Sequence, residues 1–230
     1  MSSPVKVFTA TDRVLTTVEL LTRILEYCTE YDGQTYRNAL VSRTWSDEAL
    51  SILWSELDSF IPLLKLLGPM SLVDQEGDRE SRFRYDRLIR PQDWAVFRRY
   101  SWRIREICHL EYASEVDSSV VFDLMATVAP PFPTDPLVPN LRQIVYDGAG
   151  PLLQFIPLFM NKSLERLGLY DINRDAEMMF TRTLSYIPHN APNLQCLWLT
   201  FADQIRIHPE CDAALAAIPQ LRVIWVPPTL

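Results

Sequence analysis

The chain has 230 residues and a formal net charge of −7, and 48% of its residues are hydrophobic while 22% are charged. This length can bury a sizeable core in one body, or in a short domain followed by a longer one. Residues 1–11 lack the apolar core of a secretory signal, and no apolar run reaches the roughly 18 residues of a membrane helix. The four cysteines show no paired spacing, so neither a disulfide framework nor a metal site is expected. We therefore predict a cytoplasmic or nuclear protein without a membrane partner.

The first predicted elements are three short helices within the first 57 residues. Thr16 and Glu19 have the spacing of a capping box, which marks a helix start. Apolar residues then follow on one helical face, at Leu21, Ile24, Leu25 and Cys28. Asp32 and Ser46 are placed to cap two further helices. So small a unit buries little apolar surface, so it needs a partner surface or a downstream domain.

Beyond these helices the chain becomes polar and rich in turn residues, so residues 68–81 are predicted to form a linker. Residues 79–105 then carry nine arginines against three acidic residues, with six aromatic residues interleaved. Arginines beside aromatics are typical of nucleic-acid surfaces. Because the whole chain is acidic, this stretch instead favours pairing within the protein, or an acidic protein partner, over a polyanion.

From residue 141 onward one leucine-rich pattern recurs, predicting short strands separated by helices. Its copies begin at Leu141, Leu164, Leu194 and Leu221, spaced 23, 30 and 27 residues apart, and Ile104 begins a weaker copy. Pro-Asn-Leu or Pro-Gln-Leu precedes three of the strands. Helices are expected near residues 120–128, 151–161, 175–188 and 210–217. The units predict a right-handed α/β solenoid with a parallel sheet, and the alternative is an ordinary α/β domain with four buried strands.

No catalytic pattern is present in the sequence. Nucleotide-binding glycine loops and the hydrolase nucleophile motif are absent, and the three histidines, His109, His189 and His208, lack a set of metal ligands. Overlapping P-x-x-P units are formed by Pro130, Pro133, Pro136 and Pro139. Such units are found in stiff loops and in segments that bind an SH3-like groove of a partner. We therefore expect no enzyme activity, no cofactor and no metal.

The N-terminal segment resembles an F-box. The resemblance rests on Glu19-Leu20-Leu21-x-x-Ile24-Leu25 and on Leu40-Val41-Ser42-Arg43-x-Trp45. A second resemblance, over residues 53–67 and 90–94, is to the mushroom-type fungal set of F-box proteins with leucine-rich-repeat-like regions. F-boxes usually carry proline just before the glutamate, whereas Thr17 and Val18 stand here. The resemblance implies an α+β or α/β chain with an F-box-like helical domain at 12–67, the linker, and an irregular leucine-rich-repeat-like substrate-binding region at 82–230.

The resemblance also implies a function and two surfaces. The chain would be the substrate-recognition subunit of a cullin–RING ubiquitin ligase, with a Skp-type adaptor, the cullin core and a protein substrate as partners. The alternative is an interaction scaffold that no longer binds the adaptor. The adaptor surface would comprise Leu15, Val18, Glu19, Leu20, Leu21, Ile24, Val41, Arg43 and Trp45. Because side chains alternate across a strand, the substrate surface would comprise Val145, Arg166, Tyr170, Trp198, Thr200 and Trp225, with Gly168 in the same register.

Overall fold

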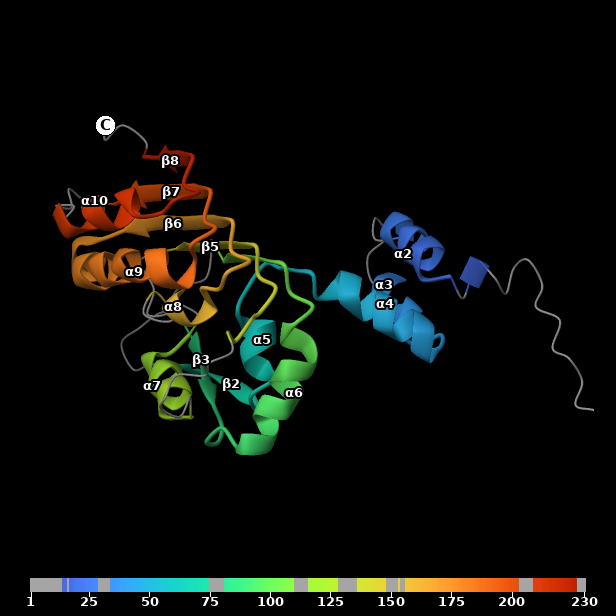
Figure 1. Cartoon of the computed structure of the whole chain (residues 1–230). Coiled ribbons are helices and arrows are strands. Elements are labelled where there is room, and N and C mark those ends of the chain that lie inside the picture. The colour runs from blue at the N-terminus through green and yellow to red at the C-terminus, as the bar shows by residue number, and fades with distance from the viewer. Residues whose placement is uncertain are drawn as a thin grey trace, which may run out of the picture. The chain divides into compact units, whose positions relative to one another are not determined.

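A computed structural model describes residues 14–15, 17–28, 34–74, 81–109, 116–127, 136–147, 153, 156–202 and 209–226. The chain divides into two compact units, residues 1–55 and residues 56–230 (Figure 1). The first unit is helical, and the second unit combines helices with a six-stranded sheet. Within the described residues, no helix is both long enough and apolar enough to cross a membrane.

The first unit contains the helices α2 (Val18–Tyr27), α3 (Gln34–Asn38) and α4 (Arg43–Leu53). The N-cap of α2 is Thr17, which makes no side-chain capping hydrogen bond, and Thr16 and Asp32 lie outside the described residues. The predicted cap Ser46 is wrong, because α4 begins one turn earlier. Ser42 is its N-cap, and the Ser42 hydroxyl oxygen accepts a hydrogen bond from the Trp45 backbone N–H at 3.3 Å.

The second unit is built on a parallel sheet with the strand order β1-β4-β5-β6-β7-β8. Parallel neighbours need a crossover, and helices supply it between the later strands. The strands are β1 (Glu56–Leu57), β4 (Glu106–His109), β5 (Gln143–Asp147), β6 (Arg166–Ile172), β7 (Cys196–Phe201) and β8 (Val223–Trp225). The expected mixed α/β fold with a parallel sheet is therefore confirmed.

Helices lie on one side of this sheet, as Figure 1 shows for α8, α9 and α10. The helices of the second unit are α5 (Ile61–Lys65), α6 (Pro91–Ser101), α7 (Ser118–Thr127), α8 (Ile156–Phe159), α9 (Glu177–Asn190) and α10 (Pro209–Ala216), and α9 follows a short 3-10 turn, Arg174–Ala176. The strand residues on the covered face, Ile107, Ile144, Leu167 and Leu197, are fully buried. This alternation explains why the leucine pattern predicts the strands.

Each repeated unit enters its strand through the same turn. The backbone N–H groups of Ile104, Leu141, Leu164, Leu194 and Leu221 each donate to the carbonyl three residues earlier, at 3.1–3.3 Å. The residue after each of the first four then offers its carbonyl to two N–H groups of the next unit; the Arg142 carbonyl, for example, accepts from Glu165 and Arg166. Ile104 therefore begins a true copy of the unit.

The units divide earlier in the chain than the expected boundary after residue 67. Glu56 and Leu57 pair in parallel with Glu106 and Ile107, so they belong to the sheet. The centroids of the Phe60 and Phe159 rings lie 5.0 Å apart, so the segment after β1 packs into the same core as the sheet. Half of the expected linker is also structured, because β2 (Met70–Asp74) pairs antiparallel with β3 (Ser81–Tyr85); residues 75–80 lie outside the described residues.

Candidate functional site: two apolar surfaces

The first unit has a small core and an unusually apolar surface. Leu21, Leu25 and Ala49 are fully buried, and Ala39, Trp45 and Ile52 pack against them. The Thr22 hydroxyl also donates to the Glu48 carboxylate at 2.9 Å, which links α2 to α4. The large apolar side chains left more than a third exposed include Val14, Val18, Leu20, Tyr27, Tyr36, Leu40, Val41 and Leu53. Exposed apolar side chains mark an interaction site where they form a contiguous patch, so these residues are candidates for one.

Most residues of the expected adaptor surface lie on the outside of this unit. Leu20 is 46% exposed and Val41 61% exposed, and Val18, Glu19 and Arg43 are also exposed. The side chains of Leu15, Ile24 and Trp45 are half-buried. Leu21 has to be removed from this surface, because it is fully buried in the core of the unit. The sequence pattern placed it correctly on a helix but did not separate the inner face from the outer one.

In the second unit, the expected register of the substrate surface is confirmed. Val145 pairs with Gly168, Gly168 with Trp198, and Trp198 with Trp225, so the four residues form one row across β5, β6, β7 and β8. Cys108 of β4 continues the row on the other side of Val145. Because side chains alternate across a strand, this row lies on the face opposite the buried leucines.

A tyrosine ring fills the place in this row that Gly168 leaves empty. A Cβ atom built on Gly168 would lie 2.8 Å from Cε2 of Tyr170 and 3.2 Å from Cγ1 of Val145. The Tyr170 ring therefore lies against the Gly168 backbone and helps to bury Val145, which is only 6% exposed. We call Val145, Trp198 and Trp225 of this row, together with the adjoining Tyr170, the aromatic strip. Only the absence of a side chain at Gly168 allows this close approach.

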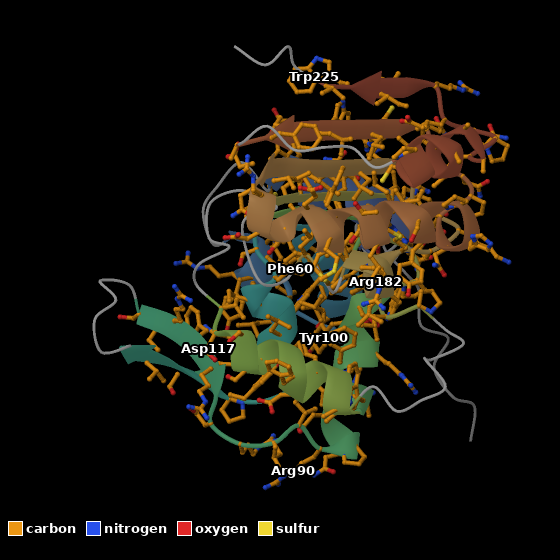
Figure 2. All side chains as sticks on the ribbon, turned by 90° about the vertical axis from the view of Figure 1, so that its left-hand side faces the viewer. Phe60, Arg90, Tyr100, Asp117, Arg182 and Trp225 are labelled. Carbon is orange, nitrogen blue, oxygen red and sulfur yellow. The ribbon has the colours of Figure 1, made fainter. Side chains whose placement is uncertain are left out.

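The exposure of the aromatic strip increases toward the last strand. Val145 is buried, Tyr170 and Trp198 are half-buried, and Trp225 is 47% exposed. Figure 2 shows Trp225 at the outer end of the second unit. Large aromatic side chains that remain accessible are the usual anchors of protein interfaces.

Two polar pairs flank the strip. On one side the Arg166 guanidinium contacts the Glu106 carboxylate at 3.0 Å across β4 and β6. On the other side the Asp171 N–H donates to the Thr200 hydroxyl oxygen at 2.7 Å, and Asp171 has a left-handed backbone with φ of 52°. Sequence reasoning missed Glu106 and Asp171. Glu106 precedes a recognisable apolar strand, whereas the bulge that sets Asp171 has no sequence signal.

Hydrogen bonds from asparagine side chains, which we call asparagine ties, join successive units just before their strands. The asparagine usual after a leucine-rich strand is absent here, with Ile172 and Ala202 in its place, and Thr229 lies outside the described residues. Instead, the side-chain amides donate to carbonyls of the preceding unit: Asn140 to Trp102 at 2.7 Å, Asn161 to Val138 at 2.9 Å and Asn193 to Lys162 at 2.7 Å. The recurrence of Pro-Asn-Leu was the available signal for Asn140 and Asn193, whereas Asn161 lies outside this motif.

Candidate catalytic and metal-binding residues are not brought together. His109 lies in β4 and His189 in the last turn of α9, while His208 lies outside the described residues. Within the described part of the chain, no three His, Cys, Asp or Glu residues are grouped as metal ligands. Burial raises the pKa of the Cys108 thiol, which accepts a weak hydrogen bond from Gln143 at 3.6 Å, so this cysteine is not an activated nucleophile.

The basic stretch forms β3, α6 and the turn into β4 rather than one continuous surface. Arg87 contacts both carboxylate oxygens of Asp93, at 2.7 and 2.9 Å, and Arg103 is buried with its guanidinium 4.4 Å above the Trp102 ring. Part of the expected intramolecular pairing is therefore present. Arg79 lies outside the described residues.

Comparisons with known proteins give no family for this chain. Models of protein families do not match the sequence, and a search of curated proteins finds no significant relative.

Proposed function

We propose that the chain is the substrate-recognition subunit of a cullin–RING ubiquitin ligase. In this proposal the first unit binds a Skp-type adaptor and the second unit holds a target protein. The chain performs no chemistry in this role, because it acts by raising the effective concentration of the target near a ubiquitin-loaded enzyme. The F-box-like residues in α2 and α4 supply the starting point of the proposal.

The observation that carries the proposal is the apolar surface of the first unit. Leu20 and Val41 are among its exposed residues, although its own core is complete without them. Fully burying a leucine or valine side chain contributes about 1.5–3 kcal/mol, so a partner that covers the exposed part of Leu20 or Val41 gains roughly half of this for each residue. A separate helical unit with such a surface fits a docking module that orients a larger substrate-binding unit.

For the second unit, we interpret the repeated strand–turn–helix units as an irregular leucine-rich-repeat-like arc. The identical turns into β4, β5, β6, β7 and β8 and the parallel sheet support this interpretation. The aromatic strip, flanked by Arg166 and Thr200, is then the surface for the target protein. Its two tryptophans are large, and Trp225 is accessible.

The alternative scaffold function has one observation in its favour. Thr17 caps α2 without a side-chain hydrogen bond at the point where an F-box usually carries proline. A less well defined helix start weakens docking of the surface that follows it. The two functions differ in one respect that can be measured, namely binding to the adaptor.

Co-purification with a Skp-type adaptor tests the proposal. We expect the wild-type chain to form a complex, and Leu20→Glu or Val41→Glu to abolish it, because each would bury an unpaired charge at a cost of several kcal/mol. Met178→Glu is the matched control, since Met178 is 77% exposed on α9 of the second unit. All three variants should keep the wild-type melting temperature. If the wild-type chain binds no adaptor at micromolar concentration, the ligase function is refuted and the scaffold function takes its place.

A further inference from the structure

A groove runs along α6 in the second unit. It has a volume of about 1020 Å³ and lies between α6 and the segment Pro136–Pro139. Figure 2 shows Arg90, at the start of α6, at the end of the second unit opposite Trp225. The groove is therefore separate from the exposed end of the aromatic strip. We call it the α6 groove.

The helix side of the groove alternates basic and aromatic side chains. Arg90, Trp94, Arg98 and Trp102 all line it and are spaced four residues apart. Residues at this spacing lie one above another on the same helical face. Between the two arginines the floor is apolar, and it includes Phe97 and Leu137. The groove thus offers two positive charges separated by an apolar surface.

Contacts among its neighbours hold the lining side chains of the groove in place. The Trp94 and Phe97 rings meet edge to face at 5.3 Å, and the Arg103 guanidinium covers one face of Trp102. The Asn140 amide donates to the Trp102 carbonyl at 2.7 Å, which fixes the Pro136–Pro139 wall to the end of the helix. Two of the P-x-x-P prolines therefore serve as a wall of the groove. Preorganised side chains lower the entropic cost of binding.

The groove carries an excess of positive charge. Among the residues described, no acidic side chain lines it. The nearby Asp93 carboxylate is held by Arg87 on both oxygens and also accepts from the Arg90 backbone N–H at 2.7 Å, so it offsets the charge of Arg90 only in part. The exposed Arg98 side chain lies two turns further along the helix. This charge distribution favours an occupant with carboxylates.

The spacing of the arginines sets the form of this occupant. Arg90 and Arg98 are eight residues apart, which corresponds to about 12 Å along a helix. An extended chain advances about 3.3 Å per residue, so acidic side chains three or four positions apart span roughly 10–13 Å. We propose that the α6 groove binds an extended acidic peptide segment of a partner protein, with two carboxylates at this spacing and apolar side chains between them.

This occupant is favoured over nucleic acid by the lining itself. A polyanion is recognised by many phosphate contacts along a basic track, whereas this groove presents two arginines around an apolar floor in a chain of net charge −7. The peptide and the nucleic acid respond differently to salt. The proposal does not depend on adaptor binding by the first unit.

The test uses the full chain and a fluorescein-labelled synthetic peptide. The peptide carries two glutamates four positions apart with leucine, proline and phenylalanine between them, and its control carries glutamines in their place. Fluorescence polarisation should show binding of the acidic peptide and at least about tenfold weaker binding of the glutamine control. Binding of both peptides alike, or of neither, would overturn the proposal.

Charge-reversal variants locate the site. Arg98→Glu should weaken binding at least about tenfold, because it places like charges together. Arg99→Glu is the matched control: Arg99 is the next residue of α6, is also exposed, and does not line the groove. Trp94→Phe replaces the indole with a smaller aromatic ring and leaves both arginines in place, so it should weaken binding less than Arg98→Glu does. Equal loss in Arg98→Glu and Arg99→Glu would mean non-specific attraction and would refute the site.

A single-stranded RNA oligonucleotide serves as the competing ligand. If it bound more tightly than the peptide and lost about a thousandfold in affinity between 50 and 200 mM salt, the groove would belong to a nucleic-acid surface instead. The peptide complex, with two ion pairs, should lose much less over the same range.

Discussion

Gly168 offers the most direct test of the aromatic strip, through the substitution Gly168→Ala. Without any clash, replacing a glycine inside a strand by alanine stabilises a protein by about 0.4–1 kcal/mol, because the unfolded chain loses freedom. Here the new Cβ would lie 2.8 Å from Tyr170 Cε2, whereas ordinary carbon contacts are about 3.5–4.0 Å. Overpacking of this kind costs about 1–3 kcal/mol. We therefore expect Gly168→Ala to destabilise the second unit by about 1 kcal/mol.

The same reasoning predicts that the sign of this effect depends on Tyr170. In a Tyr170→Ala background the closest clash is gone, and the two Val145 methyl groups remain, with Cγ1 at 3.2 Å and Cγ2 at 3.4 Å. Gly168→Ala should then be neutral or slightly stabilising, so the two substitutions should show a coupling energy of at least about 1 kcal/mol. Thermal unfolding checks this, since 1 kcal/mol shifts the melting temperature by about 2–4 °C for a body of this size. Equal effects of Gly168→Ala in both backgrounds would show that the Tyr170 ring does not lie on Gly168.

Two further predictions concern stability. Asn161 is buried and its side chain makes hydrogen bonds to Val138 and Ser163, whereas Asn193 makes its tie at the surface, so Asn161→Ala should cost about 2–3 kcal/mol and Asn193→Ala less than about 1 kcal/mol in chemical unfolding. Similar costs would contradict the difference in burial. The Arg87 guanidinium lowers the pKa of Asp93, so the pair stabilises the fold above the ordinary Asp pKa and is lost as pH falls through the lowered value. Melting temperatures between pH 6 and pH 2 should therefore fall less steeply in Asp93→Asn than in wild type, and parallel curves would contradict this.

The sequence predicts those strands and helices in which buried positions recur at a regular spacing. Strands β5, β6 and β7 carry apolar residues at alternate positions because one face is covered, and this pattern is visible without a structure. Helices α7, α9 and α10 begin within two residues of the expected positions, and α8 lies within its expected range. The register of the aromatic strip follows from the same repetition.

Elements set by distant contacts could not be predicted. The two residues of β1 become a strand only because they pair with β4, fifty residues away in sequence, and β2 forms from a segment rich in polar and turn residues. The start of α4 is a choice between two serines, Ser42 and Ser46, each followed by helix-forming residues. The hydrogen bond from the Trp45 N–H decides it in favour of Ser42. The groove along α6 depends on the wall at Pro136–Pro139, which no local pattern brings to that helix.

The asparagine ties explain how repeats of unequal length can share one sheet. The backbone turn occurs at the same position before each first leucine, and a tie lies one residue before Leu141 and Leu194 and three residues before Leu164, so the strand entrances are held in a similar way. The unit from Leu141 to Leu164 has 23 residues, whereas the unit from Leu164 to Leu194 has 30 residues and contains the fourteen-residue helix α9. Both units nevertheless lead into the next strand through the same backbone turn. Because the strand entrances do not change, the row that carries Gly168, Trp198 and Trp225 stays in register although the sequence spacing varies.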